Sequence, residues 1–383
     1  MTPRDMANDR SAGGVPWLSQ DDLPVDTYQV VAPDGSYDPA AVPDLDDDAL
    51  LELYRWMRTE RRLAERFVSL QRRGQLGTVA SGRGQEASIA GSGYALGDDD
   101  WLLGMGRETV AHLIQGASIE DFVLYWRGIE DAARRLAENR CMMAIAIGSH
   151  LPMTTGVAWG MDLTDDDAVV AAYFGDGATS TGAVHEAVNM AGVLDVPAVF
   201  FCQNNQWAIS TPFEKQTNAE TLAQRAVGYG IEGVRVDGND VLAVYAAMRA
   251  ARERARQGKP VFVESLTYRR DAHTTSDDPS RYRDEDDVEP WRDRDPIDRY
   301  EAFLEAEGLG DRVDPDAVDE EIDARIDEAV AAADDVPERD VDELFTHLYA
   351  ELPPALERQR DELEALLDER PAIAEHVEQR PKG

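Results

Sequence analysis

The stretch AVVAAYFGDGATSTG, residues 168–182, decides the fold of this 383-residue chain. Its first part, 168–174, has the length and apolar composition of a buried strand. A Gly-Asp-Gly turn follows at 175–177, and a helical pattern begins near Gly182. The glycines let a ligand approach the main chain, and the free amides of a helix start would face the same point. Asp176 is therefore either an ordinary turn residue or a ligand for a cation, and the segments around it favour the ligand.

Strands and helices alternate on both sides of this stretch. Strands are expected at 168–174, 197–203, 232–236 and 261–268, with helices at about 182–193, 219–229 and 240–257. This alternation predicts right-handed crossovers and an α/β fold in which helices cover both faces of a parallel sheet. Ligands bind at the carboxyl ends of the strands in such sheets.

A second polar group ends the next strand along the chain, at Asn204 and Asn205. One strand-helix-strand unit separates it from Asp176, so a right-handed crossover brings Asp176 and Asn205 to the same edge of the sheet. A carboxylate, an amide oxygen and a backbone carbonyl suit an octahedral Mg²⁺ that also binds phosphate oxygens and water. The pattern predicts that Asp176 holds a metal ion and that the metal holds a diphosphate.

The flanking regions differ in composition from the central one. Residues 1–45 are polar and rich in Pro, Gly and Asp, with a short extended signal at 28–31, and are expected to form an arm. A long amphipathic helix follows in DDDALLELYRWMRTERRLAERFVSLQRRG, 46–74. Residues 315–383 are acidic and helical without a strand signal. We therefore expect an N-terminal arm (1–45), an α/β domain (46–314) and a helical C-terminal extension (315–383).

The chain is strongly acidic, with 76 Asp and Glu against 38 Lys and Arg and a formal net charge of −38. This charge disfavours binding to nucleic acid and to anionic membrane surfaces. A solvated surface adapted to high salt, a halophilic surface, explains it best. Cys141 and Cys202 form no metal-spaced pair and no disulfide scaffold, which indicates a reducing compartment. Without a signal peptide or a long apolar run, we expect a soluble, cytoplasmic protein.

Two segments carry a resemblance to a known family. The sequence FGDGATSTGAVHEAVNMAGVLDVPAVFFCQNNQWAIS (174–210) and the sequence LTYRRDAHTTSDDPSRYRD (266–284) closely resemble the alpha subunit of the thiamine-diphosphate-dependent decarboxylase-dehydrogenase component of 2-oxo acid dehydrogenase complexes. The resemblance covers roughly residues 45–350. It implies a thiamine-diphosphate-binding fold for the α/β domain, with thiamine diphosphate and Mg²⁺ as cofactors.

The resemblance also implies roles for single residues near the diphosphate. Asp176, Asn205 and the main-chain carbonyl of Trp207 would be the Mg²⁺ ligands. The amides of Gly177 and Ala178 would meet the diphosphate.

Further roles follow for residues around the rest of the cofactor. His273 lies in a segment similar to the family's mobile active-site loop and would reach the terminal phosphate and assist acyl transfer to a lipoyl arm. Arg269 would order this loop, and Arg107 would bind phosphate. The carbonyl of Ile147 would lie near the aminopyrimidine ring, and Gln203 stands where many members have arginine. On composition alone, a charged surface loop is the better explanation of the segment around His273, but its match to the family's order of Tyr, Arg, His, Asp-Asp and Tyr-Arg favours the active-site loop.

The sequence also departs from the family pattern. Gly106 stands at a tyrosine position and Thr109 at a histidine position, so hydrogen-bond donors to phosphate are lost. His150 replaces a usual glutamine and is also interpretable as a packed residue at a helix start. These changes leave open a reduced cofactor affinity, an altered substrate or a loss of activity.

The resemblance places half of the active site on another chain. The glutamate that activates the cofactor comes from a beta subunit, which implies an α₂β₂ heterotetramer that passes acyl groups to a lipoyl-bearing acyltransferase. The substrate is left open between pyruvate, a branched-chain 2-oxo acid and, with related chemistry, acetoin. An assembly subunit without efficient catalysis is a second hypothesis. A nicotinamide-binding fold is disfavoured, because SGRGQEASIAG (81–91) does not follow a strand pattern.

Overall fold

A seven-stranded sheet in the order β1-β8-β9-β5-β4-β2-β3 forms the centre of the computed structural model, which describes residues 18–129, 131–335 and 341–370. The strands are β1 (Thr27–Tyr28), β2 (Trp101–Gly104), β3 (Cys141–Met143), β4 (Val170–Gly175), β5 (Ala198–Asn204), β8 (Glu232–Asp237) and β9 (Val261–Leu266). Every neighbouring pair in this sheet is parallel. The predicted fold class is confirmed.

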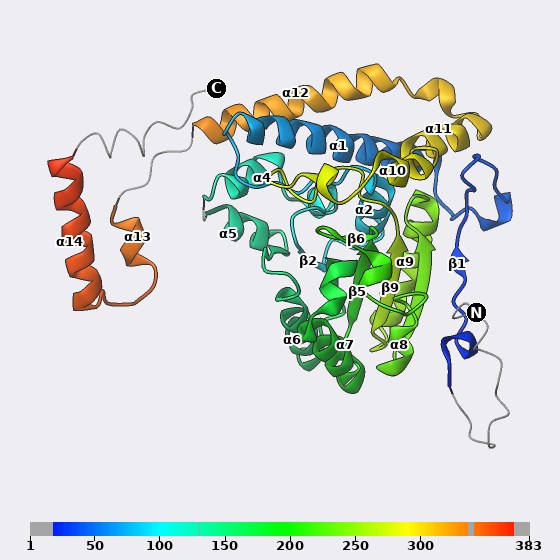
Figure 1. Cartoon of the computed structure of the whole chain (residues 1–383), viewed down its shortest axis with the longest axis horizontal. Helices are drawn as coiled ribbons and strands as arrows, with labels where there is room; N and C mark the ends of the chain where they lie inside the picture. The colour runs from blue at the N-terminus through cyan, green and yellow to red at the C-terminus, as the bar shows by residue number, and fades with distance from the viewer. Residues whose placement is uncertain (1–17, 130, 336–340, 371–383) are drawn as a thin grey trace.

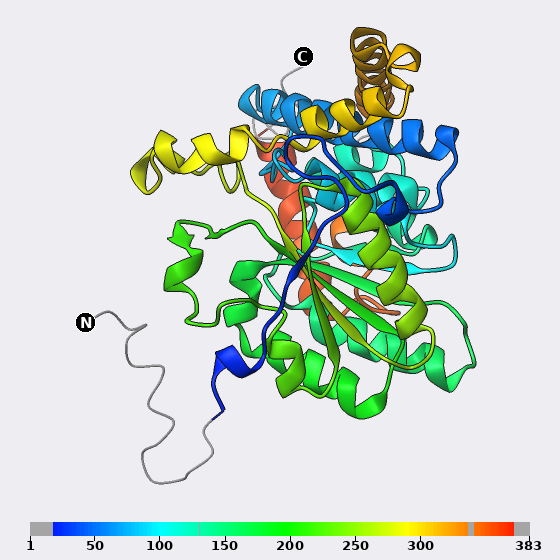
Figure 2. The same cartoon turned by 90° about the vertical axis from the view of Figure 1, so that its right-hand side faces the viewer.

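Helices cover both faces of the sheet. They are α1 (Asp47–Arg72), α2 (Glu86–Tyr94), α3 (Thr109–Ile114), α4 (Ile119–Trp126), α5 (Asp131–Glu138), α6 (His150–Leu163), α7 (Gly182–Leu194), α8 (Arg225–Gly228), α9 (Val241–Ala255), α10 (Glu285–Arg292), α11 (Pro296–Ala306), α12 (Pro315–Asp334), α13 (Glu343–Thr346) and α14 (Pro354–Glu369). Figure 1 shows α1 and α2 on one side of the strands and α6 and α7 on the other. Figure 2 gives the view at a right angle, with the twisted strands between the helices.

The central strands are buried on both faces, which explains their continuous apolar sequence. Along β4, Ala171 and Tyr173 belong to the hydrophobic core cluster that includes residues of α1, α2 and α9. Ala172 and Phe174 belong to the cluster that includes residues of α6 and α7. The period of two in a strand thus divides one apolar run between two cores.

The predicted helix at 219–229 is wrong in extent, since only α8 is helical there. The amides of Leu222 and Ala223 donate to Glu264 Oε2, at 2.8 and 3.0 Å. Glu264 is a buried residue of β9, so a tertiary contact replaces the first helical turn. The short strands β2 and β3 were not predicted, because three or four residues give too weak a pattern.

The arm and the C-terminal region meet the sheet in different ways. β1 forms the edge of the sheet beside β8, and the amides of Val30 and Val31 both donate to the buried Asp240 carboxylate at 2.7 Å. α12 lies along α1, with a bidentate pair from Arg58 to Asp319. Figure 1 shows α13 and α14 apart from the sheet. The expected boundaries at 45 and 314 stay predictions, and residues 1–17 and 371–383 of the expected arm and extension lie outside the described residues.

No helix in the described ranges has both the length and the apolar composition needed to cross a membrane.

Candidate active site

The site begins where β4 and β5 end side by side. Gly175 pairs with Gln203 in the parallel register, so the residues after each strand emerge at the same edge. Asp176 opens a 3₁₀ helix, Asp176–Ser180, that lies between β4 and α7. The sequence had suggested that the α-helix itself would face the turn, but this extra turn intervenes. The amides of Gly177 and Ala178 therefore belong to the 3₁₀ helix.

Three oxygen-bearing groups meet at this edge. One atom of the Asn205 side-chain amide lies 3.3 Å from Asp176 Oδ1 and 3.2 Å from the Trp207 carbonyl oxygen. If this atom is the amide nitrogen, it donates to both oxygens. If it is the amide oxygen, three oxygens converge on one point, the arrangement expected around a hard cation. The donor set fits Mg²⁺, with one carboxylate and two neutral oxygens.

Burial disfavours an unpaired negative charge on the Asp176 carboxylate. The side chain is buried, and desolvation raises its pKa to about 6, partly offset by a hydrogen bond from Gln216. A bound cation would favour the ionised form. Among the described residues, no group of three or more His, Cys, Asp or Glu side chains could hold a metal. The candidate site instead combines one carboxylate with an amide and a main-chain carbonyl.

A small hairpin covers the turn that carries Asp176. Its strands are β6 (Trp207–Ala208) and β7 (Thr211–Pro212). A Cβ added at Gly177 would lie 2.7 Å from Ala208 Cβ. Gly177 is thus required because the hairpin packs directly on the turn, and this packing brings the Trp207 carbonyl towards Asp176.

Two buried arginines lie beside these oxygens without acidic partners. Arg107 donates to the carbonyls of Ser81 and His273. Arg269 donates to the carbonyl of Ile209 at 2.6 Å and to Tyr282 Oη at 2.9 Å. Within the described part of the chain, neither forms a salt bridge, although the protein carries twice as many acids as bases. Burial lowers the pKa of both arginines, that of Arg107 to about 10. Because neither has an acidic partner among the described residues, the two guanidinium groups can bind an anion.

His273 lies next to both arginines. Its backbone amide donates to Asp277 Oδ2 at 2.8 Å, and its Nδ1 is 3.4 Å from Arg269 Nη1. Burial and the charges of Arg107 and Arg269 lower its pKa to about 4. The expectation that its protonated form is stabilised therefore does not hold without a ligand, because burial and the two arginines outweigh the opposing charge of Asp277.

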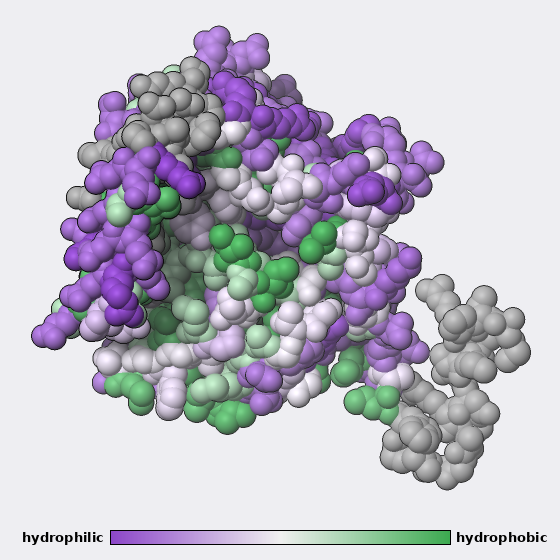
Figure 3. Space-filling view, turned by 60° about the vertical axis from the view of Figure 1, so that its left-hand side comes forward, coloured by the Kyte–Doolittle hydropathy of each residue, from purple (hydrophilic) through white to green (hydrophobic). Residues whose placement is uncertain are grey.

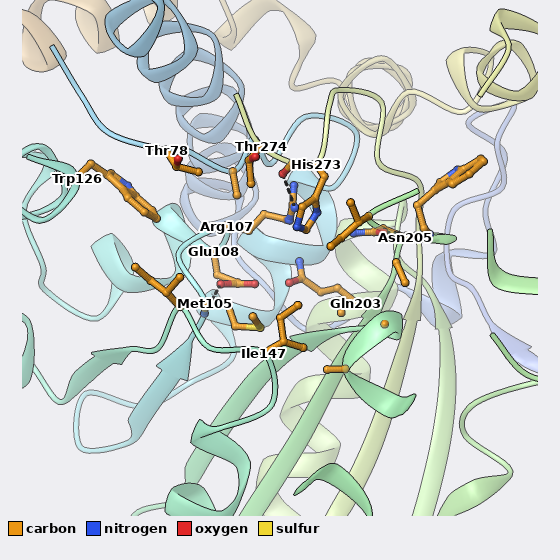
Figure 4. Close-up of a pocket in the computed structure, with 18 of the residues that line it drawn as sticks. Thr78, Met105, Arg107, Glu108, Trp126, Ile147, Gln203, Asn205, His273 and Thr274 are labelled. Carbon is orange, nitrogen blue, oxygen red and sulfur yellow. Dashed lines mark hydrogen bonds between the residues drawn. The ribbon is translucent and has the colours of Figure 1, made fainter. Parts of the chain in front are cut away.

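These groups lie around a cavity of about 670 Å³. Figure 4 shows Arg107, Gln203, Asn205 and His273 around it, with Trp126, Met105 and Ile147 on another side. The residues with expected roles that line the cavity are Arg107, Ile147, Gly177, Ala178, Gln203, Asn205, Trp207 and His273. Asp176 and Arg269 lie behind this lining and reach it through Asn205 and His273.

The sequence did not single out several lining residues. These are chiefly Thr78, Met105, Glu108, Tyr125, Trp126 and Thr274. Glu108 follows Arg107 directly, so its place could have been inferred. Trp126 ends α4 and gave no signal in the sequence.

The departures from the family pattern have local explanations. Gly106 has φ +93°, and a Cβ there would lie 2.7 Å from Trp126 Cζ2 and 2.6 Å from Met143 Cε. Trp126 thus fills the room that a side chain at Gly106 would need. His150 is buried, bonds through Nε2 to the Tyr173 carbonyl at 2.9 Å and does not line the cavity. This supports the interpretation of His150 as a packed residue.

Several known proteins share much of this sequence. The family model described as "Dehydrogenase E1 component" matches residues 54–342. The chain is 42% identical over 353 residues to the 3-methyl-2-oxobutanoate dehydrogenase subunit alpha of Mycobacterium tuberculosis, covering 90% of this chain and 95% of that protein. It is 43% identical over 318 residues to the pyruvate dehydrogenase E1 component subunit alpha of Bacillus cereus, covering 82% and 85%. With the corresponding Bacillus subtilis subunit, the identity is 41% over 337 residues, covering 87% and 91%.

Proposed function

This chain belongs to the dehydrogenase E1 component family, and from that premise we propose that it is the alpha subunit of a thiamine-diphosphate-dependent 2-oxo acid dehydrogenase. One observation carries the proposal. The Asp176 carboxylate, the Asn205 side-chain amide and the Trp207 carbonyl meet beside a cavity that two arginines, without acidic partners among the described residues, also approach. Metal-ligand candidates beside guanidinium groups that donate to neutral oxygens suit a metal-bound diphosphate.

The residues divide into groups that would hold different parts of the cofactor. Asp176, Asn205 and the Trp207 carbonyl would bind Mg²⁺, and the amides of Gly177 and Ala178 would donate to phosphate oxygens.

Other lining residues would hold the rest of the cofactor and the substrate. Arg107 would pair with phosphate, and Arg269 would support the loop through its bonds to Tyr282 and Ile209. Gln203 Nε2 is buried without a partner in the described structure and is free to donate to the ligand. The Ile147 carbonyl would face the pyrimidine end. Thiamine diphosphate, when bound, supplies the electron sink for decarboxylation.

His273 would move a proton or donate a hydrogen bond near the diphosphate. In the described structure, its ring is held neutral by burial and two cations. A diphosphate bound near His273 would raise the pKa of this residue towards neutrality, the range suited to general acid–base catalysis. Its place on a loop would let it assist acyl transfer to a lipoyl group.

Exposed apolar side chains support a partner subunit. They are Ile145, Ile147 and Ile209 at the cavity, Met153, Trp159 and Leu163 on α6, and Met190 and Val193 on α7. Figure 3 shows apolar residues exposed across this side of the molecule. No atom of the described residues lies within 4 Å of a Cβ added at Gly156 or Gly160 on α6, so another helix can approach closely. A beta subunit on this face would complete the active site in an α₂β₂ assembly that serves a lipoyl-bearing acyltransferase.

The net charge and the cysteines support a cytoplasmic protein that works at high salt. The net charge of −38 fits a protein that works at high salt, and the buried free thiols of Cys141 and Cys202 fit a reducing cytoplasm.

The test is to co-express the chain with its beta chain and to measure thiamine-diphosphate-dependent CO₂ release from pyruvate and 3-methyl-2-oxobutanoate. Release from either acid supports the proposal. Acetaldehyde release from acetoin, measured in parallel, without CO₂ release from either acid would assign the chain to an acetoin dehydrogenase. No cofactor binding and no turnover would contradict the proposal and favour an assembly role.

A further inference from the structure

Gln216 contacts the carboxylate that the proposed metal site depends on. It follows a 3₁₀ turn, Phe213–Lys215, that continues from the β6–β7 hairpin. Its Nε2 donates to Asp176 Oδ2 at 2.6 Å and to the Thr211 carbonyl at 3.2 Å. The other oxygen, Asp176 Oδ1, faces Asn205. The two oxygens of one carboxylate thus have separate partners.

We propose that Gln216 is a positioning residue that fixes the Asp176 carboxylate so that Oδ1 points at the divalent cation. This inference rests on the proposed function, because it needs a metal at Asp176. Gln216 itself would touch neither the metal nor the diphosphate.

The backbone around Gln216 holds the side chain in place. The Phe213 amide donates to the Gln206 carbonyl at 3.0 Å, and the Gln216 amide donates to the Phe213 carbonyl at 2.9 Å. The same hairpin carries the Trp207 carbonyl. One short segment therefore supplies a proposed ligand and restrains another, which couples the positions of the two.

No second side chain performs this task in the part of the protein that the structure describes. Among the described residues, Gln216 is the side-chain donor to Asp176 Oδ2, whereas Asp176 Oδ1 faces Asn205. Gln216 Oε1 is buried without a hydrogen-bond partner, so the amide is held by its nitrogen alone. Loss of Gln216 would free the carboxylate to rotate or to offer both oxygens to the metal.

A comparison of Mg²⁺ with Ca²⁺ binding distinguishes a positioning role of Gln216 from a general contribution to the stability of the fold. Mg²⁺ requires nearly ideal octahedral geometry, whereas Ca²⁺ accepts flexible and bidentate carboxylates. Loss of an outer partner of a metal ligand typically costs about 10- to 100-fold in metal affinity. A misplaced carboxylate should weaken Mg²⁺ binding more than Ca²⁺ binding, while a loosened fold should weaken both equally.

The experiment uses the full chain co-purified with its beta subunit at a fixed thiamine diphosphate concentration. Calorimetric titration gives the Kd for Mg²⁺ and, separately, for Ca²⁺ in the wild type, in Gln216→Leu and in Gln224→Leu. Gln224 is a matched control, because it is a buried glutamine bonded to Leu23 and Thr221, away from Asp176. Gln216→Asn, which is one methylene shorter, serves if Gln216→Leu does not fold.

We expect Gln216→Leu to raise the Kd for Mg²⁺ about 10- to 100-fold, and that for Ca²⁺ at least about threefold less. The control should match the wild type. Equal Mg²⁺ affinity in Gln216→Leu and the wild type, or equal losses for both cations, would overturn the inference while leaving the proposed function intact. A wild type that binds no metal with the cofactor would overturn the proposed function itself.

Discussion

The side chains of Asp176 and Asn205 approach within 3.3 Å at the ends of two neighbouring parallel strands. This proximity follows from the register, since β4 and β5 pair residue by residue up to Gly175 and Gln203. It brings the Asn205 amide to the wall of the cavity and the Asp176 carboxylate directly behind that wall. The predictions below test what each part of this arrangement does.

Arg107→Met should weaken thiamine diphosphate binding about 10- to 100-fold, because a buried charge-assisted bond to phosphate is worth about 1.5–3 kcal/mol. The Kd from fluorescence titration of the assembled protein checks this. Arg134→Met is the control, since Arg134 is an exposed residue of α5 that pairs with Asp131 and Glu138. A Kd for Arg107→Met within twofold of the wild type would show that Arg107 does not bind the phosphate.

His273→Ala should keep cofactor binding within about tenfold and lower turnover of the assembled complex by about 10² or more. The neutral ring contributes little to binding, since its pKa is lowered to about 4 before an anion enters. Steady-state CO₂ release with a lipoyl acceptor measures the effect. Wild-type turnover in the variant would remove His273 from the mechanism.

Gly106→Ala should lower the free energy of unfolding by about 1–3 kcal/mol. Gly106 has φ +93°, and the new Cβ would meet Trp126 and Met143. Urea denaturation of the variant measures the loss, and Gly128→Ala separates the two causes. Gly128 has φ +78° but open space around an added Cβ, so it carries the backbone strain without the contact. Equal losses in the two variants would mean that Trp126 imposes no steric limit at Gly106.

Glu60→Gln should remove a pH dependence of stability. Burial raises the pKa of Glu60 to about 8, so the folded state keeps a proton that the unfolded chain releases above its ordinary value near 4.5. Stability from this group is complete below pH 4.5 and is lost as the pH rises towards 8. Thermal unfolding from pH 5 to pH 8 should show the wild-type Tm falling relative to that of Glu60→Gln. Parallel curves for the two proteins would show that Glu60 ionises normally in the fold.

The sequence predicted the central sheet because its strands are buried on both faces. The runs at 168–174 and 197–203 lack polar residues until the strand ends, so β4 and β5 could be placed within one or two residues. The pairing of Asp176 with Asn205 followed from the handedness of one crossover. These features depend on local pattern and general topology.

Other parts of the site depend on contacts between distant segments. Trp126 reaches the cavity only because α4 packs near Gly106, and Gln216 meets Asp176 through a hairpin whose geometry has no periodic signal. The predicted helix at 219–229 failed for a similar reason, because Glu264 captures the amides of its first turn. Tertiary contacts of this kind override local propensity.

The most direct test of the metal site is Mg²⁺-dependent binding of thiamine diphosphate by Asp176→Asn in the assembled protein. Asp195→Asn is the control, because Asp195 is exposed at the end of α7 with φ 52°, a conformation that asparagine tolerates. Calorimetry should show a loss of at least about 100-fold in affinity for Asp176→Asn, with unchanged circular dichroism, and no loss for the control. Wild-type affinity in Asp176→Asn would contradict the account, since no metal would then depend on this carboxylate.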